Sequence, residues 1–431
     1  MPFDLQTCDA LPSEGSTRSG PAVAATTLMP PVQQLPESPG DHTESVAPRW
    51  TLPVLCSAAF LVFAQAFMVA PLIPRLAQVF HSTTTVVGLA VPAYLVPYGV
   101  MTLVWGPLSD RFGRRAVIFG SLAFFIVLTA ATVSASSGTA FVGWRIATGV
   151  GASGVVPISL ALIGDLVPFE RRGRALGWLF GAMAGGIAVG STGGALAEPV
   201  VGWQGLFAGV AVLATTLGAV GMLTRAIPGL PRPAEAAPLR TVARGYVSLL
   251  GQARARRTYA YVLINAVLHS GVYTWLGLYL YDRFGLGPTG IGLALLGYGI
   301  PGFVFGPLIG ATADRHGRAH LIPLGVTIGA ACALGLAAPV PLVAAAVLVT
   351  FLSLGYDLTQ PLLGGIVTAL PANRGQAMGF NVFTLFVGFG VGSLIFQAAL
   401  GWGFTDALGA FGAGALIAAA LAVRLFRTEH S

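Results

Sequence analysis

Several ionisable and amide side chains lie inside long apolar segments, where burial away from water is costly. The ionisable ones are Arg145, His269 and Asp357, and Gln65 and Asn265 add amide groups. Polar residues in such segments usually face the interior of a helix bundle or a water-filled path, and they mark binding or proton transfer. The set that we take as a candidate substrate and coupling cavity is Gln65, Arg145, Asn265, His269, Tyr273, Asp357 and Gln360.

Asp357 is the member of this set best suited to exchange a proton. A carboxylate that is buried away from a partner can hold a proton near neutral pH, because burial disfavours its charge. The alternative is a fixed ion pair or a carboxylate that caps a neighbouring helix. Arg145 stays protonated, so we expect it to bind an anionic group or to tune a nearby carboxylate.

One segment carries polar residues at regular spacing. Tyr261, Asn265, His269 and Tyr273 recur every four residues and form one slanting face of a helix. A polar, aromatic face inside an apolar helix indicates a wet cavity that contacts a substrate or a proton. The alternative is that His269 makes a hydrogen bond between helices.

The composition fixes the solvent in which the chain folds. Of the 431 residues, 55% are hydrophobic and 9% are charged, and the mean hydropathy is +0.78. A soluble domain has about 25% charged residues, so we expect most of the surface to face a lipid bilayer. All 23 basic residues are Arg, and the net charge of +7 indicates cytoplasmic loops, not a nucleic-acid partner.

Apolar stretches alternate with short polar breaks from Thr51 onward, and each has about the 20 residues that a helix needs to cross a membrane. Polar and apolar residues do not alternate within them as they would in the strands of a β-barrel. The predicted fold class is therefore an all-α membrane protein with 12 transmembrane helices. The predicted spans are 51–74, 84–108, 115–135, 140–164, 174–198, 202–224, 258–281, 289–312, 319–338, 341–366, 376–399 and 402–424.

The Arg residues predict the orientation. If both termini are cytoplasmic, the inner loops and tails hold twenty Arg and the outer loops hold two. Positive residues concentrate on the cytoplasmic side, so we expect a multi-pass protein of the inner (cytoplasmic) membrane with both termini inside. The predicted division is a disordered cytoplasmic tail at 1–49, a six-helix bundle at 50–224, a cytoplasmic linker at 225–257 and a second six-helix bundle at 258–427.

A charged loop after the second span is repeated later in the chain. It reads GPLSDRFGRR from Gly106, and the end of the eighth span reads GATADRHGR from Gly310, with 204 residues between the two Asp positions. A second pair of segments, RGRALG from Arg172 and RGQAMG from Arg374, lies 202 residues apart. Two matches at nearly one offset indicate duplicated halves.

Acidic and basic residues near these loops are suited to a latch between two conformations. Charge-assisted hydrogen bonds among Asp110, Arg114 and Asp165 can hold neighbouring helices together in one state and be lost in another. The alternative is that Arg sets the topology and Asp caps the helices. The predicted latch comprises Asp110, Arg111, Arg114, Asp165, Asp314 and Arg318.

At these residues the chain resembles the major facilitator superfamily, whose signature is the Asp-Arg-x-Gly-Arg loop that begins here at Asp110. Arg145 and the glycines after it resemble the family's second motif. The fifth span resembles the glycine motif of the drug:proton antiporter branch, with Ser191 in place of the usual proline and Ala195 in place of the last glycine. The glycines of these two motifs are Gly149, Gly151, Gly154, Gly177, Gly186, Gly190 and Gly194.

The resemblance implies two pseudo-symmetric six-helix bundles and transport by alternating access. It also implies that the first, fourth, seventh and tenth helices line a central cavity, and the polar set selected above comes from those four helices. We expect Gly186, Gly190 and Gly194 to serve close helix packing, because small residues let membrane helices approach each other.

These features favour proton-coupled efflux of a drug or small amphiphilic metabolite. An alternative is an uptake symporter or uniporter for a sugar or small organic acid, although the polar groups are few for a sugar. The first span lacks Asp and Glu, which argues against a cationic drug. A membrane-embedded sensor or enzyme is a distant alternative, because the sequence has no nucleophile elbow, phosphate-binding loop or metal-ligand spacing. We expect a monomer without cofactor or metal.

Overall fold

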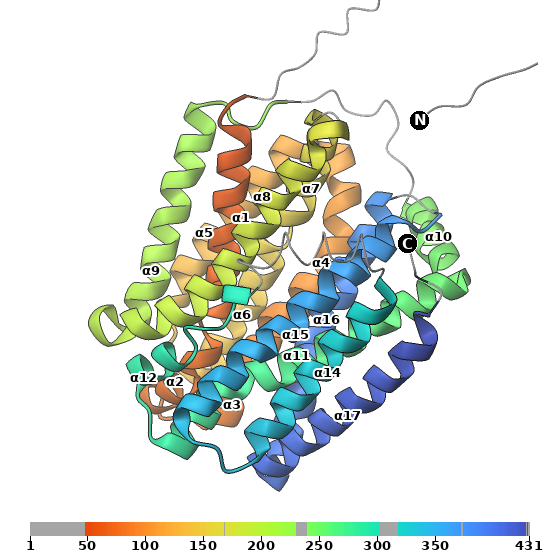
Figure 1. Cartoon of the computed structure of the whole chain (residues 1–431). Helices are drawn as coiled ribbons and strands as arrows, with labels where there is room; N and C mark the ends of the chain where they lie inside the picture. The colour runs from red at the N-terminus through yellow and green to blue at the C-terminus, as the bar shows by residue number, and fades with distance from the viewer. Residues whose placement is uncertain are drawn as a thin grey trace, which may run out of the picture. The chain divides into compact units, whose positions relative to one another are not determined.

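The computed structural model describes residues 48–167, 169–229, 239–301, 318–371, 374–427 and 429. All regular elements in these ranges are helices (Figure 1). The predicted all-α class is confirmed. The predicted tail, apart from its last two residues, and the predicted latch residue Asp314 lie outside the described residues.

The described part of the chain contains ten helical segments that are long and apolar enough to cross a membrane. They cover all the predicted spans except 289–312, which lies outside the described residues from residue 302 onward. The segment Arg174–Leu223 covers two predicted spans at once. Its backbone turns at Gly202, whose φ of +70° is a conformation that glycine adopts without strain. The predicted break between the fifth and sixth spans is therefore present.

The helices that precede the linker run from red to green in Figure 1. They are α1 (Thr51–Phe67), η1 (Ala70–Leu72), α2 (Ile73–Val79), α3 (Thr84–Gly88), α4 (Ala90–Phe112), α5 (Arg114–Thr132), α6 (Gly138–Ala152), α7 (Val155–Leu166), α8 (Phe169–Ala188), the π-helical turn η2 (Val189–Gly193) and α9 (Gly194–Leu223). Several predicted spans are thus interrupted: the first at η1, the second between α3 and α4, the fourth between α6 and α7, and the fifth at η2.

The helices after residue 238 run from green to blue. They are α10 (Leu239–Gly251), α11 (Ala253–Phe284), α12 (Pro288–Ala294), α14 (Arg318–Ala337), α15 (Leu342–Thr368), α16 (Arg374–Ala399), η3 (Leu400–Trp402) and α17 (Phe404–Leu425). The amphipathic helix α10 lies within the predicted linker and packs its buried Leu249 near α11 and α16.

Glycines of α8, η2 and α9 lie against the backbone of α1. A Cβ atom at Gly186 would lie 2.5 Å from the carbonyl oxygen of Phe60, and one at Gly190 would lie 2.3 Å from that of Ala64. Gly194 faces Met68 one turn further along. Because a side chain at the first two positions would overlap α1, these glycines set how closely the two helices approach.

The same packing occurs in the later half of the chain, between α11 and α16. A Cβ atom at Gly392 would lie 2.2 Å from the carbonyl oxygen of Val267, and Gly388 faces Leu263. Gly388 and Gly392 follow Gly186 and Gly190 by the same 202 residues that separate the repeated sequence segments. The repeat thus extends from the loops to the close contacts between helices.

Contacts between the two halves also involve glycines. The helix α4 packs along α16, where a Cβ atom at Gly390 would lie 2.3 Å from the side chain of Val96. Gly277 of α11 lies against Pro71 of η1 in the same way. The halves therefore meet closely at α4, α16, η1 and α11.

The last described residue, Glu429, joins the end of the chain to the start of α11. Arg254 donates hydrogen bonds of 2.9 and 2.6 Å to its two carboxylate oxygens, and Arg257 donates another. The hydrogen bonds from Arg254 and the two positive charges lower the pKa of the Glu429 carboxyl. The segment after α17 is therefore held at the entrance of α11.

Gly190→Ala tests the packing of the fifth span on α1. The added methyl group would overlap the Ala64 carbonyl oxygen, so the helices have to move apart. We expect the free energy of unfolding to fall by about 1–3 kcal/mol, measured as a lower Tm in detergent. Gly181→Ala is the matched control in α8, because its Cβ atom would meet nothing within 4 Å. Equal Tm values for the two variants would contradict the close contact.

Candidate functional site

Arg145 of α6 is completely buried and binds carbonyl groups at the end of α1. Its Nη1 donates to Gln65 Oε1 at 2.9 Å and to the Gln65 carbonyl oxygen at 3.3 Å, and its Nη2 donates to the Ala66 carbonyl oxygen at 2.9 Å. Its Nε donates to the Ala90 carbonyl oxygen at 3.2 Å. The last carbonyl groups of a helix have no hydrogen-bond donor within that helix. Arg145 donates to those of Gln65 and Ala66, where α1 ends. The guanidinium also lies 4.2 Å from the ring centre of Tyr94.

This geometry changes the expectation for Arg145. No ion pair with a carboxylate is formed by Arg145 among the residues that the structure describes. Its donors point at carbonyl oxygens and at Gln65, not at an anionic group. The interrupted α1 thus offers acceptors that the sequence did not reveal, and a role of Arg145 in binding an anion or tuning a carboxylate stays a prediction.

A continuous set of rings, which we call the aromatic layer, connects the two halves of the chain. Tyr98 of α4 stacks on Phe386 of α16 with ring centres 4.3 Å apart. Phe67 of α1 lies 5.9 Å from Tyr273 of α11. The centre of each ring in the layer lies within 6.3 Å of the centre of another. The members are Phe63, Phe67, Tyr94, Tyr98, His269, Tyr273, Tyr298, Tyr356, Phe386 and Phe389.

Three buried hydroxyl groups of the aromatic layer make no hydrogen bond of good geometry with the residues that the structure describes. They belong to Tyr94, Tyr98 and Tyr273, which are at most 3% exposed, and the Tyr273 hydroxyl lies near the hydroxyl of Ser191. A buried hydroxyl without a partner costs about 1–3 kcal/mol. Natural proteins rarely leave such groups unpaired without a functional reason. The three hydroxyls therefore mark a place where a ligand or water can bind.

His269 occupies the centre of the layer in the later half. Its Nε2 lies 2.6 Å from the hydroxyl oxygen of Tyr298, and its ring stacks on Tyr356 with centres 4.1 Å apart. Tyr273 lies parallel to it on the same helix. The four-residue spacing predicted a polar face here, and the structure adds Tyr298 and Tyr356 from two other segments.

Asp357 is half-buried and has partners. Ser353 Oγ donates to its Oδ2 at 3.0 Å and accepts a hydrogen bond from the backbone N–H of Gly299 at 3.1 Å. Ser353, one turn earlier, is therefore a partner of the carboxylate, and proton exchange at Asp357 stays a prediction.

The helix that contributes Tyr298 is broken at this level. The helix α12 ends at Ala294, a turn covers residues 295–299, and Gly299 has a φ of +85°. The break faces the π-helical turn η2, whose Thr192 donates to the carbonyl oxygen of Leu295 at 3.2 Å. Interrupted helices often build the binding sites of transporters because they free backbone groups.

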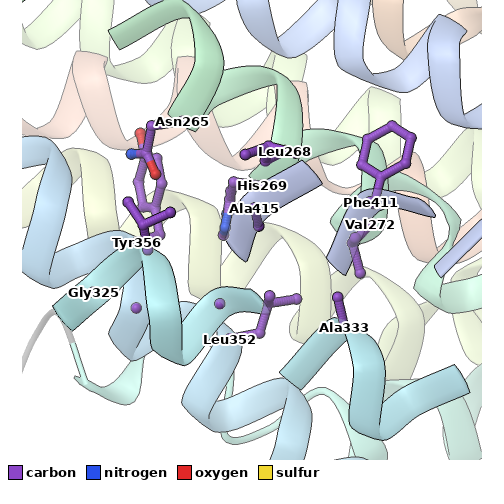
Figure 2. Close-up of a pocket in the computed structure, with 13 residues that line it drawn as sticks. Asn265, Leu268, His269, Val272, Gly325, Ala333, Leu352, Tyr356, Phe411 and Ala415 are labelled. Carbon is purple, nitrogen blue, oxygen red and sulfur yellow. The ribbon is translucent and has the colours of Figure 1, made fainter. Parts of the chain in front are cut away.

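Figure 2 shows a cavity in the later half, between α11, α14, α15 and α17. Asn265 and His269 reach it from α11 and Tyr356 reaches it from α15, while the other walls are apolar side chains and glycines. The volume of the cavity that admits the centre of a water molecule is about 30 Å³. That room suits about two waters, and a drug-sized solute does not fit.

The residues predicted to share one cavity are therefore divided among several places. Gln65 and Arg145 bind each other beside α1, and Asn265 and His269 line the cavity in Figure 2. Tyr273 belongs to the aromatic layer. Asp357 binds Ser353, and the Oε1 atom of Gln360 is buried without a hydrogen-bond partner.

The predicted latch residues of the first half lie together. Arg114 pairs with Asp110 at 3.1 Å and with Asp165 at 3.2 Å, so it joins the end of α4 and the start of α5 to the end of α7. Arg111 is exposed beside them. The side chain of Arg318 lies outside the described part of the chain, as does Asp314.

Tyr94 and Tyr98 are the site residues that the sequence analysis missed. They lie four residues apart in one apolar span, the same spacing that drew attention to His269 and Tyr273. That signal was present in the sequence. Tyr298 and Ser353 carried no such signal, because they join the site through contacts between helices.

Comparisons with known proteins agree with this architecture. The sequence profile of the Major Facilitator Superfamily matches residues 55–393 and 279–431. An uncharacterized MFS-type transporter of Bacillus subtilis is 27% identical over 274 residues, which are 63% of this chain and 66% of that protein. The chloramphenicol resistance protein of Streptomyces lividans is 26% identical over 387 residues, 87% of this chain and 95% of that protein.

The fold is also similar to solved structures. A D-xylose-proton symporter superposes with a TM-score of 0.71 at 18% sequence identity, covering 87% of this chain and 97% of that one. At this identity the similarity concerns the fold and not the solute.

Arg145→Met tests the contacts of the guanidinium with α1. The change leaves buried carbonyl oxygens of Gln65, Ala66 and Ala90 without donors. We expect the free energy of unfolding to fall by about 3 kcal/mol or more, seen as a lower Tm in detergent. Arg115→Met, at an exposed position, is the control and should change Tm little. An unchanged Tm for Arg145→Met would show that these carbonyls do not depend on Arg145.

Proposed function

Because this chain belongs to the Major Facilitator Superfamily, a family of transporters and not of enzymes, we propose that it exports a small amphiphilic solute in exchange for protons. The solute class that the site favours is a neutral aromatic compound with hydroxyl or amide groups. Transport proceeds by alternating access of a site between the two halves.

The unpaired hydroxyls of the aromatic layer carry this proposal. Tyr94 and Tyr98 come from the first half and Tyr273 from the second, so a solute that binds all three contacts both halves. Rings such as Phe386 provide stacking surfaces for an aromatic solute. Hydroxyls that regain hydrogen bonds only when solute is present give binding without a fixed charge.

The charge of the site favours a neutral solute. The helix α1 carries no Asp or Glu, and Arg145 is occupied by carbonyl groups. The Streptomyces lividans relative is a chloramphenicol resistance protein. Chloramphenicol is a neutral aromatic molecule with hydroxyl groups, and it is therefore the first solute to test.

Asp357 is the residue that we assign to proton exchange. Its carboxylate accepts a hydrogen bond from Ser353, and it directly follows Tyr356 of the aromatic layer in the chain. A carboxylate among hydroxyl groups has partners in both its charged and its protonated form. Gain and loss of its proton would change hydrogen bonds with the residues that surround the solute.

The proposal also covers the two helix bundles that move relative to each other during transport. We assign residues 50–224 and 258–427 to two bundles, with both termini in the cytoplasm, the protein in the inner membrane and a monomer as the working unit. The cluster of Asp110, Arg114 and Asp165 is the latch that differs between the two states.

Asp357→Asn tests the coupling. In proteoliposomes loaded with chloramphenicol or related neutral aromatic solutes, we expect transport driven by a pH gradient to fall at least tenfold. Solute binding in detergent should stay within about twofold, because Asn keeps the size and a hydrogen-bonding carbonyl. Asp406→Asn, an exposed carboxylate at the start of α17, is the control.

Two outcomes would contradict the coupling. Wild-type rates and an unchanged response to pH in Asp357→Asn would remove Asp357 from proton exchange. Concentration-dependent uptake of a sugar or organic acid by the wild type, with no export of the aromatic solutes, would favour the symporter alternative.

Tyr98→Phe tests the unpaired hydroxyls. Removing a buried hydroxyl that has no partner should leave Tm unchanged or raise it, because nothing is lost in the free protein. The affinity for the solute should fall about five- to tenfold, because the complex loses one hydrogen bond. Tyr279→Phe is the control: its hydroxyl donates to the Leu336 carbonyl oxygen at 2.9 Å, so Tm should fall while affinity holds. Equal affinity of Tyr98→Phe and wild type would contradict the site.

A further inference from the structure

The cavity in Figure 2 lies apart from the contact between the two halves. Its walls come from α11, α14, α15 and α17, all within the later half of the chain. The aromatic layer, by contrast, joins α1 and α4 to α11 and α16. His269 and Tyr356 belong to both places. The cavity therefore touches the layer at two residues without being part of the space between the halves.

The polar wall of the cavity is suited to water. Among the described residues, the Nδ2 atom of Asn265 has no hydrogen-bond partner, although Asn265 is only 7% exposed. His269 lines the cavity too, with the ring of Tyr356 stacked on it. A buried water needs roughly 10–15 Å³ for its centre and two to four polar partners. The cavity has enough volume, because about 30 Å³ of it admits the centre of a water molecule. The polar partners are the side chains of Asn265, His269 and Tyr356.

We propose that this cavity holds water and supplies protons to Asp357 through His269 and Tyr298. The proposal rests on the proton exchange proposed above and gives it a route. Asn265 and His269, both labelled in Figure 2, line the cavity from α11. Solute and protons would then reach the centre of the protein by separate paths.

Each proton transfer along this route is balanced. A protonated water in the cavity gives a proton to one ring nitrogen of His269, and the other ring nitrogen, Nε2, releases its proton to the hydroxyl oxygen of Tyr298, 2.6 Å away. Tyr298 then releases its own hydroxyl proton toward Asp357, whose carboxylate is joined through Ser353 to the backbone N–H of Gly299, the residue after Tyr298. Cavity water loses one proton, Asp357 gains one, and His269 and Tyr298 return to neutral forms.

The groups that face His269 permit this role. Tyr273 on its own helix, Tyr298 after α12 and Tyr356 of α15 are the titratable groups around the ring, and α16 contributes Phe389. The helices α14 and α17 contribute only apolar residues and glycines to the cavity. Within the described ranges, no fixed charge in direct contact holds the imidazole in one protonation state.

Gly329 provides a way to fill the cavity without touching these groups. It lines the cavity, and a Cβ atom there would meet nothing within 4 Å, so an added side chain enters the empty space. Gly329→Val should displace the water, and Gly329→Ala is the smaller variant if valine lowers expression. Gly409→Val is the matched control, because Gly409 of α17 also has open space and does not line the cavity.

The first measurement compares two modes of transport in proteoliposomes. Transport of chloramphenicol driven by a pH gradient should fall at least tenfold in Gly329→Val. Equilibrium exchange of labelled for unlabelled solute, without a gradient, should stay within about twofold of wild type. Wild-type rates under a pH gradient would overturn the proposal. Loss of both modes would overturn it too, because the cavity would then serve the solute.

The second measurement detects the water itself. Hydroxyl-radical footprinting in detergent modifies side chains beside buried water, and Tyr356 and Phe411 of the cavity wall are reactive probes. We expect their modification to fall several-fold in Gly329→Val and not in Gly409→Val. Low modification of both residues in the wild type would show a dry cavity and overturn the proposal. If the wild type shows hydration but no response to a pH gradient, the proposed proton exchange fails and this route fails with it, while the hydrated cavity remains.

Discussion

A polar group that leaves water needs a hydrogen-bond partner inside the protein, and this requirement determines the arrangement at the centre of the chain. Each guanidinium nitrogen of Arg145 has a partner, because the group faces three carbonyl groups and the Gln65 amide where α1 ends and α4 begins. The buried hydroxyls of Tyr94, Tyr98 and Tyr273 lack such hydrogen bonds among the described residues. The Arg145 guanidinium therefore holds helices together, whereas the tyrosine hydroxyls are available to bind a ligand.

The same constraint explains why the irregular backbone lies where it does. Breaks at η1, at η2 and at residues 295–299 expose carbonyl and N–H groups that a regular helix would pair. Thr192 and Ser353 each bind one of these groups across a helix boundary. Close glycine contacts bring the segments near enough for such bonds, because Gly292 faces the Thr192 carbonyl oxygen and Gly297 faces Thr350 of α15. The proposed site thus lies where hydrogen bonds of a regular helix are replaced by hydrogen bonds to side chains.

Much of the framework could be predicted from the sequence, because apolar length and Arg placement reflect the bilayer directly. The candidate site was harder. Arg145, His269 and Asp357 stood out as costly residues, but their partners come from other helices: Gln65 for the first and Tyr298 for the second. Gly297, Gly299 and Pro301 mark the break that positions Tyr298, but they do not show which residue Tyr298 contacts. Polarity therefore located the costly groups, and only the packing showed which of them are already satisfied.

Proton release on solute binding is the most direct test of coupling between the aromatic layer and Asp357. Chloramphenicol is added to purified protein in weakly buffered detergent solution, and a pH indicator records the protons released across about pH 6–8. Wild type should release protons as solute binds, and Asp357→Asn should bind without release. Binding to wild type with no proton release at any pH in this range, or equal release by both proteins, would contradict the exchange of solute for protons at this site.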